Sequence, residues 1–261
     1  MPSGATFDSD GVRLAYDDLR PDGDDGTAAP IVLVHGFASS RHDNWYDWDW
    51  DEALLGAGRR VIALDCRGHG ESEKPHAPEA YDTATMAADV IRLLDHLGID
   101  QADLLGYSMG GRIGLEALYT YPERFNAGVL AGIGSATLEA SDAGERIADG
   151  LLTDDPDELS DPVGKRFRTF AETTDNDLEA LAACARSRTP PADWEQLSDV
   201  ERPVLIVAGE DDDVAGDPRE LAARFPDGEA VVVSDADHLT TVPNERFTDA
   251  AVTFLEEVAL Q

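Results

Sequence analysis

A serine between two glycines has the clearest capacity for chemistry in this sequence. The segment Gly106-Tyr107-Ser108-Met109-Gly110 follows an apolar run that ends at Leu105 and precedes a stretch with helical periodicity. Glycines at these two places permit a sharp turn from strand to helix, because side chains there would clash. Such a turn holds the serine hydroxyl at the carboxyl edge of a sheet, where the start of the next helix directs free N–H groups at it. We therefore expect Ser108 to be a nucleophile.

A serine hydroxyl is a poor nucleophile until a base within hydrogen-bond reach accepts its proton. Of the six histidines, only His238 lies beyond Ser108, and in a strand–serine–helix arrangement of this kind the acid and the base follow the nucleophile. His238 comes after an apolar run and a turn-like segment, 234–237, which predicts a position at the same sheet edge. A purely structural loop histidine is the alternative. A carboxylate must orient the imidazole, and the acidic run 210–213 offers adjacent candidates.

The elements that must position these residues are visible as apolar runs. Runs without polar alternation predict strands buried on both faces, as in a parallel sheet. They occur at 31–34, 61–64, 102–105, 127–131, 204–208 and 230–233. Before them, residues 5–7 and 12–16 flank a turn and predict an antiparallel edge pair.

Stretches with helical spacing of apolar residues alternate with these strands. They occur at 84–97, 109–121 and 247–258. Alternating strands and helices predict an α/β fold with a mostly parallel central sheet flanked by helices. The alternation breaks between 135 and 202, where only helical pieces occur. We expect a core made of 1–134 and 203–261, with 135–202 inserted as a small helical cap.

Several motifs, in order along nearly the whole chain, resemble those of the α/β-hydrolase superfamily. They are the Ser108 turn, His35-Gly36-Phe37 (similar to the oxyanion loop), Asp65-Cys66-Arg67-Gly68-His69-Gly70-Glu71-Ser72 (similar to the D-x-R-G-x-G-x-S turn), Gly209-Glu210-Asp211-Asp212 (similar to the late G-x-x-D segment) and Asp237-His238. The resemblance implies the α/β-hydrolase fold and a carboxylesterase-like serine hydrolase. No metal or organic cofactor is implied.

The resemblance also implies roles for individual residues. Family spacing places the triad acid three residues after Gly209, at Asp212, and its acidic neighbours are then a solvated run. The two backbone N–H donors of the oxyanion hole are expected from Met109 and Phe37. His35 is expected to brace the Phe37 loop rather than to titrate.

The 65–72 segment contains a histidine and carboxylates, but their spacing matches no recognised metal-ligand set. We interpret it as a glycine-shaped turn in which Arg67 could pair with a carboxylate and Cys66 is a small buried residue.

Aromatic residues cluster in two places that could form a substrate pocket. Trp45 and Trp48 lie at i and i+3 and could share a helix face, while Phe167, Phe170 and Trp194 lie in the expected cap. One interpretation is that they line the pocket. The other is that they only pack the helix and the cap against the core.

We expect hydrolysis of carboxylic esters through an acyl-enzyme. A C–C bond hydrolase, a lactonase or a cofactor-free perhydrolase would use the same triad. Serine at 108 argues against an epoxide hydrolase or haloalkane dehalogenase, whose family relatives use aspartate there. A hydrolase-fold ligand-binding protein is the non-enzyme alternative, and the complete triad argues against it. The natural substrate depends on the geometry of the cap, and the oligomeric state is open.

The charge balance excludes some partners. The 261 residues carry 20 Lys+Arg against 54 Asp+Glu, a formal charge of -34, with 42% hydrophobic residues and 28% charged residues. Nucleic acid and anionic membrane surfaces would be repelled. The composition resembles that of haloarchaeal proteins, and molar salt, with a Debye length of about 3 Å, would screen the self-repulsion. An ordinary acidic surface is the alternative.

Two cysteines, Cys66 and Cys184, allow at most one disulfide, which favours a reducing compartment. The first residues contain no basic or apolar targeting segment, and no apolar run approaches the length of a membrane span. We expect a cytoplasmic location and a small-molecule ester as the partner.

Overall fold

The structure is a computed structural model that describes residues 4–23, 26, 28–156, 159–174, 176–187, 190 and 193–260. Its strands are β1 (Ala5–Ser9), β2 (Val12–Leu19), β3 (Ile31–Val34), β4 (Val61–Leu64), β5 (Ala102–Tyr107), β6 (Phe125–Ala131), β7 (Val204–Gly209) and β8 (Gly228–Val233). Its helices are α1 (Arg41–Asn44), α2 (Trp50–Gly56), α3 (Thr83–Leu97), α4 (Met109–Thr120), α5 (Ala143–Leu152), α6 (Pro162–Ala171), α7 (Leu178–Ala185), α8 (Trp194–Leu197), α9 (Pro218–Ala222) and α10 (Glu245–Ala259). Short 3₁₀ turns are η1 (Tyr46–Trp48), η2 (Pro78–Tyr81), η3 (Pro122–Arg124) and η4 (Ser135–Leu138).

All eight strands form one sheet in the order β1-β2-β4-β3-β5-β6-β7-β8. Strands β3 to β8 pair in parallel, whereas β1 and β2 pair antiparallel with each other and β2 pairs antiparallel with β4. The predicted edge hairpin and the six predicted parallel strands are therefore confirmed. So is the α/β fold with a mostly parallel central sheet.

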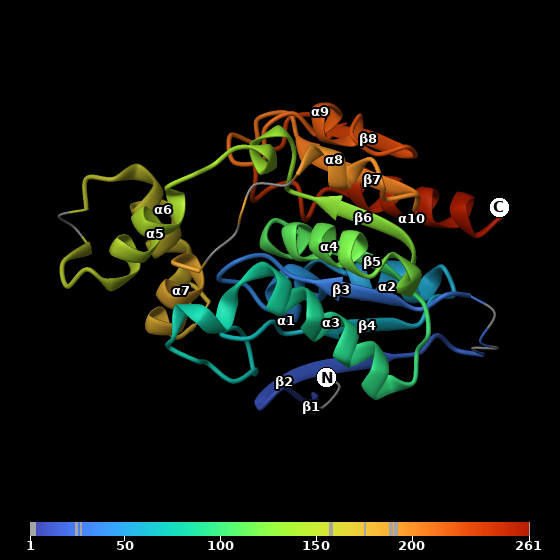
Figure 1. Cartoon of the computed structure of the whole chain (residues 1–261), viewed down its shortest axis with the longest axis horizontal. Coiled ribbons are helices and arrows are strands. Elements are labelled where there is room, and N and C mark those ends of the chain that lie inside the picture. The colour runs from blue at the N-terminus through green and yellow to red at the C-terminus, as the bar shows by residue number, and fades with distance from the viewer. Residues whose placement is uncertain are drawn as a thin grey trace.

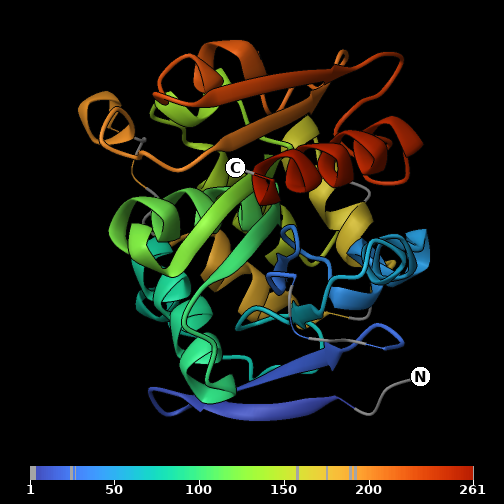
Figure 2. The ribbon, with the colours of Figure 1, turned by 90° about the vertical axis from the view of Figure 1, so that its right-hand side faces the viewer.

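Helices cover both faces of this sheet because its central strands are apolar on both sides. Every residue of β3, β4, β5 and β7 is buried. Figure 2 shows α3 and α4 on one side of the sheet and α10 on the other. The first face packs against α3, α4 and α9, and the second against α2 and α10. Burying both faces fixes the strand ends, and these ends carry the candidate chemistry.

Helices α5, α6 and α7 lie together to one side of the sheet (Figure 1). They share a small apolar cluster, and Ala38, from the loop after β3, is part of it. Residues Leu197 and Val200, which also fall within the expected cap segment 135–202, pack instead in the main core. The group that projects from the sheet is thus α5–α7, and the division of the chain into core and cap remains a proposal.

The 65–72 segment is held by buried ion pairs. Arg67 donates to both carboxylate oxygens of Asp89 at 2.7 Å, and Cys66 is buried beside it. Gly70 has φ +50, and a Cβ there would lie 2.2 Å from an oxygen of Asp65. Among the described residues, no group of three or more His, Cys, Asp or Glu side chains is arranged to hold a metal ion. In that same part of the chain, no helix is long and apolar enough to cross a membrane.

Candidate active site

Ser108 occupies the turn between β5 and α4 in a strained backbone conformation. Its φ is 53° and its ψ is -108°, and a positive φ is rare for a residue with a side chain. The flanking glycines make the turn possible. A Cβ on Gly106 would lie 2.2 Å from the Gly110 carbonyl oxygen, and one on Gly110 would lie 2.0 Å from the Val34 carbonyl oxygen. The predicted steric reason for both glycines is confirmed.

Three polar side chains that are distant in sequence meet at this turn. The Nε2 atom of His238 lies 2.9 Å from Ser108 Oγ. The Nδ1 atom of the same ring lies 2.8 Å from Asp212 Oδ2 and 3.0 Å from Oδ1. This arrangement matches a hydroxyl nucleophile, its base and the acid that orients the base.

Asp212 differs from its acidic neighbours in its surroundings. It is buried, whereas Asp211 and Asp213 are exposed. Its Oδ1 atom also accepts backbone N–H bonds from Val214 at 3.0 Å and Ala215 at 2.9 Å. Burial raises the pKa of Asp212, but the hydrogen bond and charge of His238 and these two N–H bonds outweigh it and lower the pKa below its usual value. The carboxylate is therefore ionised at neutral pH and can hold a charged imidazole.

The loop that carries His238 is fixed on both sides. Asp237 accepts hydrogen bonds from the N–H groups of Leu239 at 3.0 Å and Thr240 at 2.8 Å. On the other side, the Tyr107 hydroxyl donates to the His238 carbonyl oxygen, and the two rings lie 5.6 Å apart. This contribution of Tyr107 was not predicted from the sequence. The signal available in the sequence was a tyrosine directly beside Ser108, because the hydroxyl of a tyrosine that is buried there needs a hydrogen-bond partner.

We expect Tyr107→Phe to lower kcat about tenfold. The substitution leaves the partly buried His238 carbonyl without its donor, which costs about 1–3 kcal/mol and loosens the imidazole. Steady-state kinetics with a chromogenic ester would measure it. Tyr46→Phe is the matched control, because it removes another tyrosine hydrogen bond, to Asp17 at 3.0 Å, away from this site. Equal kcat values for the two variants would contradict this role of Tyr107.

The loop after β3 runs directly beside the serine. A Cβ on Gly36 would lie 3.6 Å from Ser108 Cβ. The Gly36 N–H donates to Asn44 Oδ1 at 2.9 Å. His35 accepts the Cys66 N–H at Nε2 (3.0 Å) and therefore donates from Nδ1 to the Gly36 carbonyl (2.7 Å). Burial lowers the pKa of His35 to about 4, so the ring is neutral. The expectation that His35 braces this loop is confirmed.

The two expected oxyanion donors flank the serine on different elements. Met109 is the first residue of α4, so its N–H has no acceptor within the helix. Phe37 follows Gly36 in the braced loop, and no acceptor within the described ranges engages its N–H. Both groups are thus available to a developing negative charge.

A comparison with known families decides the affiliation of the chain. The family described as alpha/beta hydrolase fold matches residues 29–185, more than half of the chain. The chain belongs to the α/β-hydrolase family.

Full-length similarities to this hydrolase cover several reactions. A Bacillus subtilis protein, provisionally named 2-succinyl-6-hydroxy-2,4-cyclohexadiene-1-carboxylate synthase, is 28% identical over 91% of this chain and 92% of its own. The 3-oxoadipate enol-lactonase 2 of Acinetobacter baylyi is 29% identical over 83% of this chain and 85% of its own. A thermophilic esterase structure from Thermogutta terrifontis has a TM-score of 0.78 and 26% identity, covering 99% of this chain and all (100%) of that one. The family is therefore shared, but the named activities differ.

A cavity of about 600 Å³ opens at the serine of the hydrolase. Trp48, Phe167 and Phe170 line it, together with Ser108 and His238. The side chain of Trp194, also considered for the pocket, lies outside the described residues. The cavity is large enough for a small organic molecule.

The expectation that Trp45 lines the pocket is wrong. Its side chain is fully buried (0% exposed), with its ring 5.6 Å from that of Trp50, whereas Trp48 is 49% exposed. The two tryptophans do not share a helix face, because α1 ends at Asn44 and a 3₁₀ turn follows, with Asp49 at φ 56°. Trp45 therefore packs under the sheet, and only Trp48 reaches the cavity.

Proposed function

We propose that this α/β-hydrolase cleaves carboxylic esters through an acyl-enzyme. The observation that carries the proposal is the pair of contacts of His238, 2.9 Å to Ser108 Oγ and 2.8 Å to Asp212 Oδ2. Ser108 attacks the ester carbonyl while Nε2 of His238 accepts the hydroxyl proton. Asp212 holds the ring and stabilises its positive charge.

The N–H groups of Phe37 and Met109 are proposed to stabilise the tetrahedral oxyanion. When the intermediate collapses, His238 gives its proton to the leaving alcohol oxygen, and an ester between Ser108 and the acyl group remains. A water molecule then attacks this ester, His238 again accepts the proton, and the serine hydroxyl is regenerated as the acid leaves.

The supporting similarities are to an esterase and to a lactonase, which opens a cyclic ester. Lactone opening needs the same triad and the same two N–H donors, acting in the same order, so it is a variant of the proposed reaction. C–C bond cleavage and perhydrolysis would also begin from this triad. Substrate panels separate these reactions.

Labelling by a fluorophosphonate tests the proposal without knowledge of the substrate. We expect covalent labelling that maps to the peptide containing Ser108, because only an activated serine reacts. A panel of nitrophenyl esters of rising chain length, with a lactone and a vinylogous 1,5-diketone in parallel, would then define the reaction. An unlabelled protein that still binds small molecules would instead support a ligand-binding protein.

We also propose that the acidic surface is adapted to high salt. With a formal charge of -34, the fold should lose stability as KCl falls from about 2 M to about 0.1 M, because screening of self-repulsion weakens. Melting curves would measure this, with sorbitol at equal osmolality as the control. A melting temperature independent of KCl would contradict the adaptation.

A further inference from the structure

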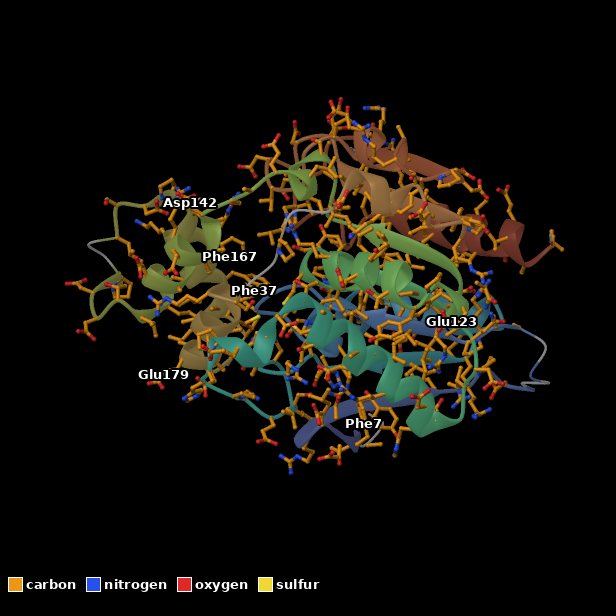
Figure 3. All side chains as sticks on the ribbon, in the orientation of Figure 1. Phe7, Phe37, Glu123, Asp142, Phe167 and Glu179 are labelled. Atoms are coloured by element: carbon orange, nitrogen blue, oxygen red, sulfur yellow. The ribbon has the colours of Figure 1, made fainter. Side chains whose placement is uncertain are left out.

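A second cavity, of about 250 Å³, reaches the same serine. It shares Ser108, Phe37 and Phe167 with the larger cavity, so the two adjoin at the hydroxyl. The Phe37 and Phe167 rings contact each other edge to face at 5.7 Å and lie where the α5–α7 group meets the rest of the molecule (Figure 3). A substrate whose scissile bond lies at Ser108 would therefore place one part in each cavity.

Arg112 lines the second cavity and has no partner in the part of the chain that the structure describes. Its side chain is partly buried, yet it forms no hydrogen bond or ion pair with any described residue. Every other described arginine that is at least partly buried engages a carboxylate or a backbone carbonyl, as Arg67 engages Asp89. A partly buried guanidinium without a partner is therefore exceptional among the described arginines of this chain, which has 54 acidic residues.

The position of Arg112 argues against a purely structural role, because a positive charge there is expected to destabilise the fold. It lies in the first turn of α4, where the helix dipole already supplies partial positive charge and a cation is destabilising. Burial without a partner lowers the pKa of the guanidinium below its usual value, although it remains charged. Glu116, one turn further on, bonds Thr120 at 3.1 Å instead of Arg112. Arg112 and the free N–H groups at the start of α4 thus form one positive region beside Ser108.

The lining of the larger cavity, in contrast, is negatively charged. Asp43, Asp211 and Asp237 line it, and its lining arginine, Arg166, is already paired with Asp213 at 3.1 Å. An anionic group would be repelled there and attracted to the second cavity. The two cavities therefore orient a substrate that has one anionic end and one neutral or apolar end.

We propose that the second cavity binds a carboxylate of the substrate and that Arg112 is the residue that binds it. The inference rests on the proposed function in one respect, that the bond cleaved at Ser108 is an ester. A carboxylate fits better than a phosphate dianion, because a single planar guanidinium matches one carboxylate in charge and in bidentate geometry. Glu139, an exposed residue that also lines this cavity, adds one negative charge and further disfavours a dianion.

Matched methyl esters test the inference in the wild-type enzyme. Monomethyl glutarate and methyl valerate have similar length and differ in the terminal carboxylate. We expect kcat/KM to favour monomethyl glutarate, and Arg112→Met to lower the ratio of the two values about ten- to a hundredfold, the effect of losing a charge-assisted hydrogen bond. Arg112→Lys should retain part of the preference. Using the ratio cancels any general effect of the variant on turnover.

Binding to Ser108→Ala tests the same inference independently of hydrolysis. Calorimetric titration at one fixed salt concentration should show tighter binding of monomethyl glutarate than of methyl valerate. Adding Arg112→Met to Ser108→Ala should abolish the difference. If the wild-type protein cleaves neither ester, the proposed function fails, while this titration still decides whether the cavity binds a carboxylate.

Two controls separate ligand binding from structural effects. Arg219→Met removes one positive charge from an exposed side chain (67% exposed) and should leave the ligand preference intact. Arg112→Met should melt at or above the wild-type temperature, because it removes an unpaired, partly buried charge. Equal affinity of Ser108→Ala for the two ligands would overturn the proposal. So would a preference that survives Arg112→Met.

Discussion

Replacing Ser108 by alanine is expected to lower kcat for ester hydrolysis by about 10⁶-fold, the loss seen when a triad nucleophile is removed. The substitution removes only the hydroxyl that lies 2.9 Å from His238 Nε2. Alanine carries the same Cβ as serine at φ 53°, so the turn gains no new clash. Kinetics with a nitrophenyl ester would measure the loss, and fluorophosphonate labelling should disappear with it.

Ser234→Ala is the matched control for this variant. Ser234 is exposed and follows β8 at the same sheet edge, but it lines neither cavity at Ser108. It should keep wild-type activity and labelling. If Ser108→Ala retained more than about one hundredth of kcat, the hydrolysis would not depend on an acyl-enzyme at this residue.

Asp212→Asn should lower kcat by about four orders of magnitude without unfolding the protein. Asparagine has nearly the same shape, and its amide oxygen can still accept the Val214 and Ala215 N–H bonds made by Asp212 Oδ1. It cannot stabilise the imidazolium that forms when His238 takes the serine proton. Because asparagine does not ionise, raising the pH should not restore activity.

Glu210→Gln is the matched control within the same acidic run. Glu210 is exposed and lines neither cavity at the serine, so its neutralisation should leave kcat unchanged. Together the two variants separate a specific role of Asp212 from a general effect of local negative charge. Comparable losses in both variants would assign the effect to the acidic run as a whole.

Much of the fold could be predicted because its signals are local. Four-residue apolar runs such as 31–34 and 61–64 have no polar face, and strands of that kind are stable only inside a sheet covered on both sides. The predicted helix 84–97 corresponds to α3, Thr83–Leu97, because Asp82 caps its start and Gly98 ends it. The same local logic failed for 44–50, where α1 ends at Asn44 and Trp48 belongs to a 3₁₀ turn rather than to the same helix as Trp45.

Parts of the site escaped sequence analysis because they depend on distant contacts. Tyr107 is an unremarkable position within the Ser108 turn until its hydroxyl meets the His238 carbonyl, 131 residues away. In the sequence, Arg112 is simply an arginine on a predicted helix, and such a residue is ordinarily exposed to solvent. Only the assembled chain reveals that Arg112 lines a cavity and pairs with no carboxylate of the described residues.

The sequence by itself determined the class of fold, the residue types of the candidate triad and the strongly acidic character of the chain. These follow from periodicity, from glycines required by a tight turn and from counts of charge, all of which are local or additive. The tertiary structure alone decided which tryptophan reaches the cavity and which partly buried arginine lacks a partner among the described residues, and it places Asp212, the acid implied by the family resemblance, beside His238. Burial and pairing are properties of the assembled chain, because each depends on which distant segments exclude water from a given side chain.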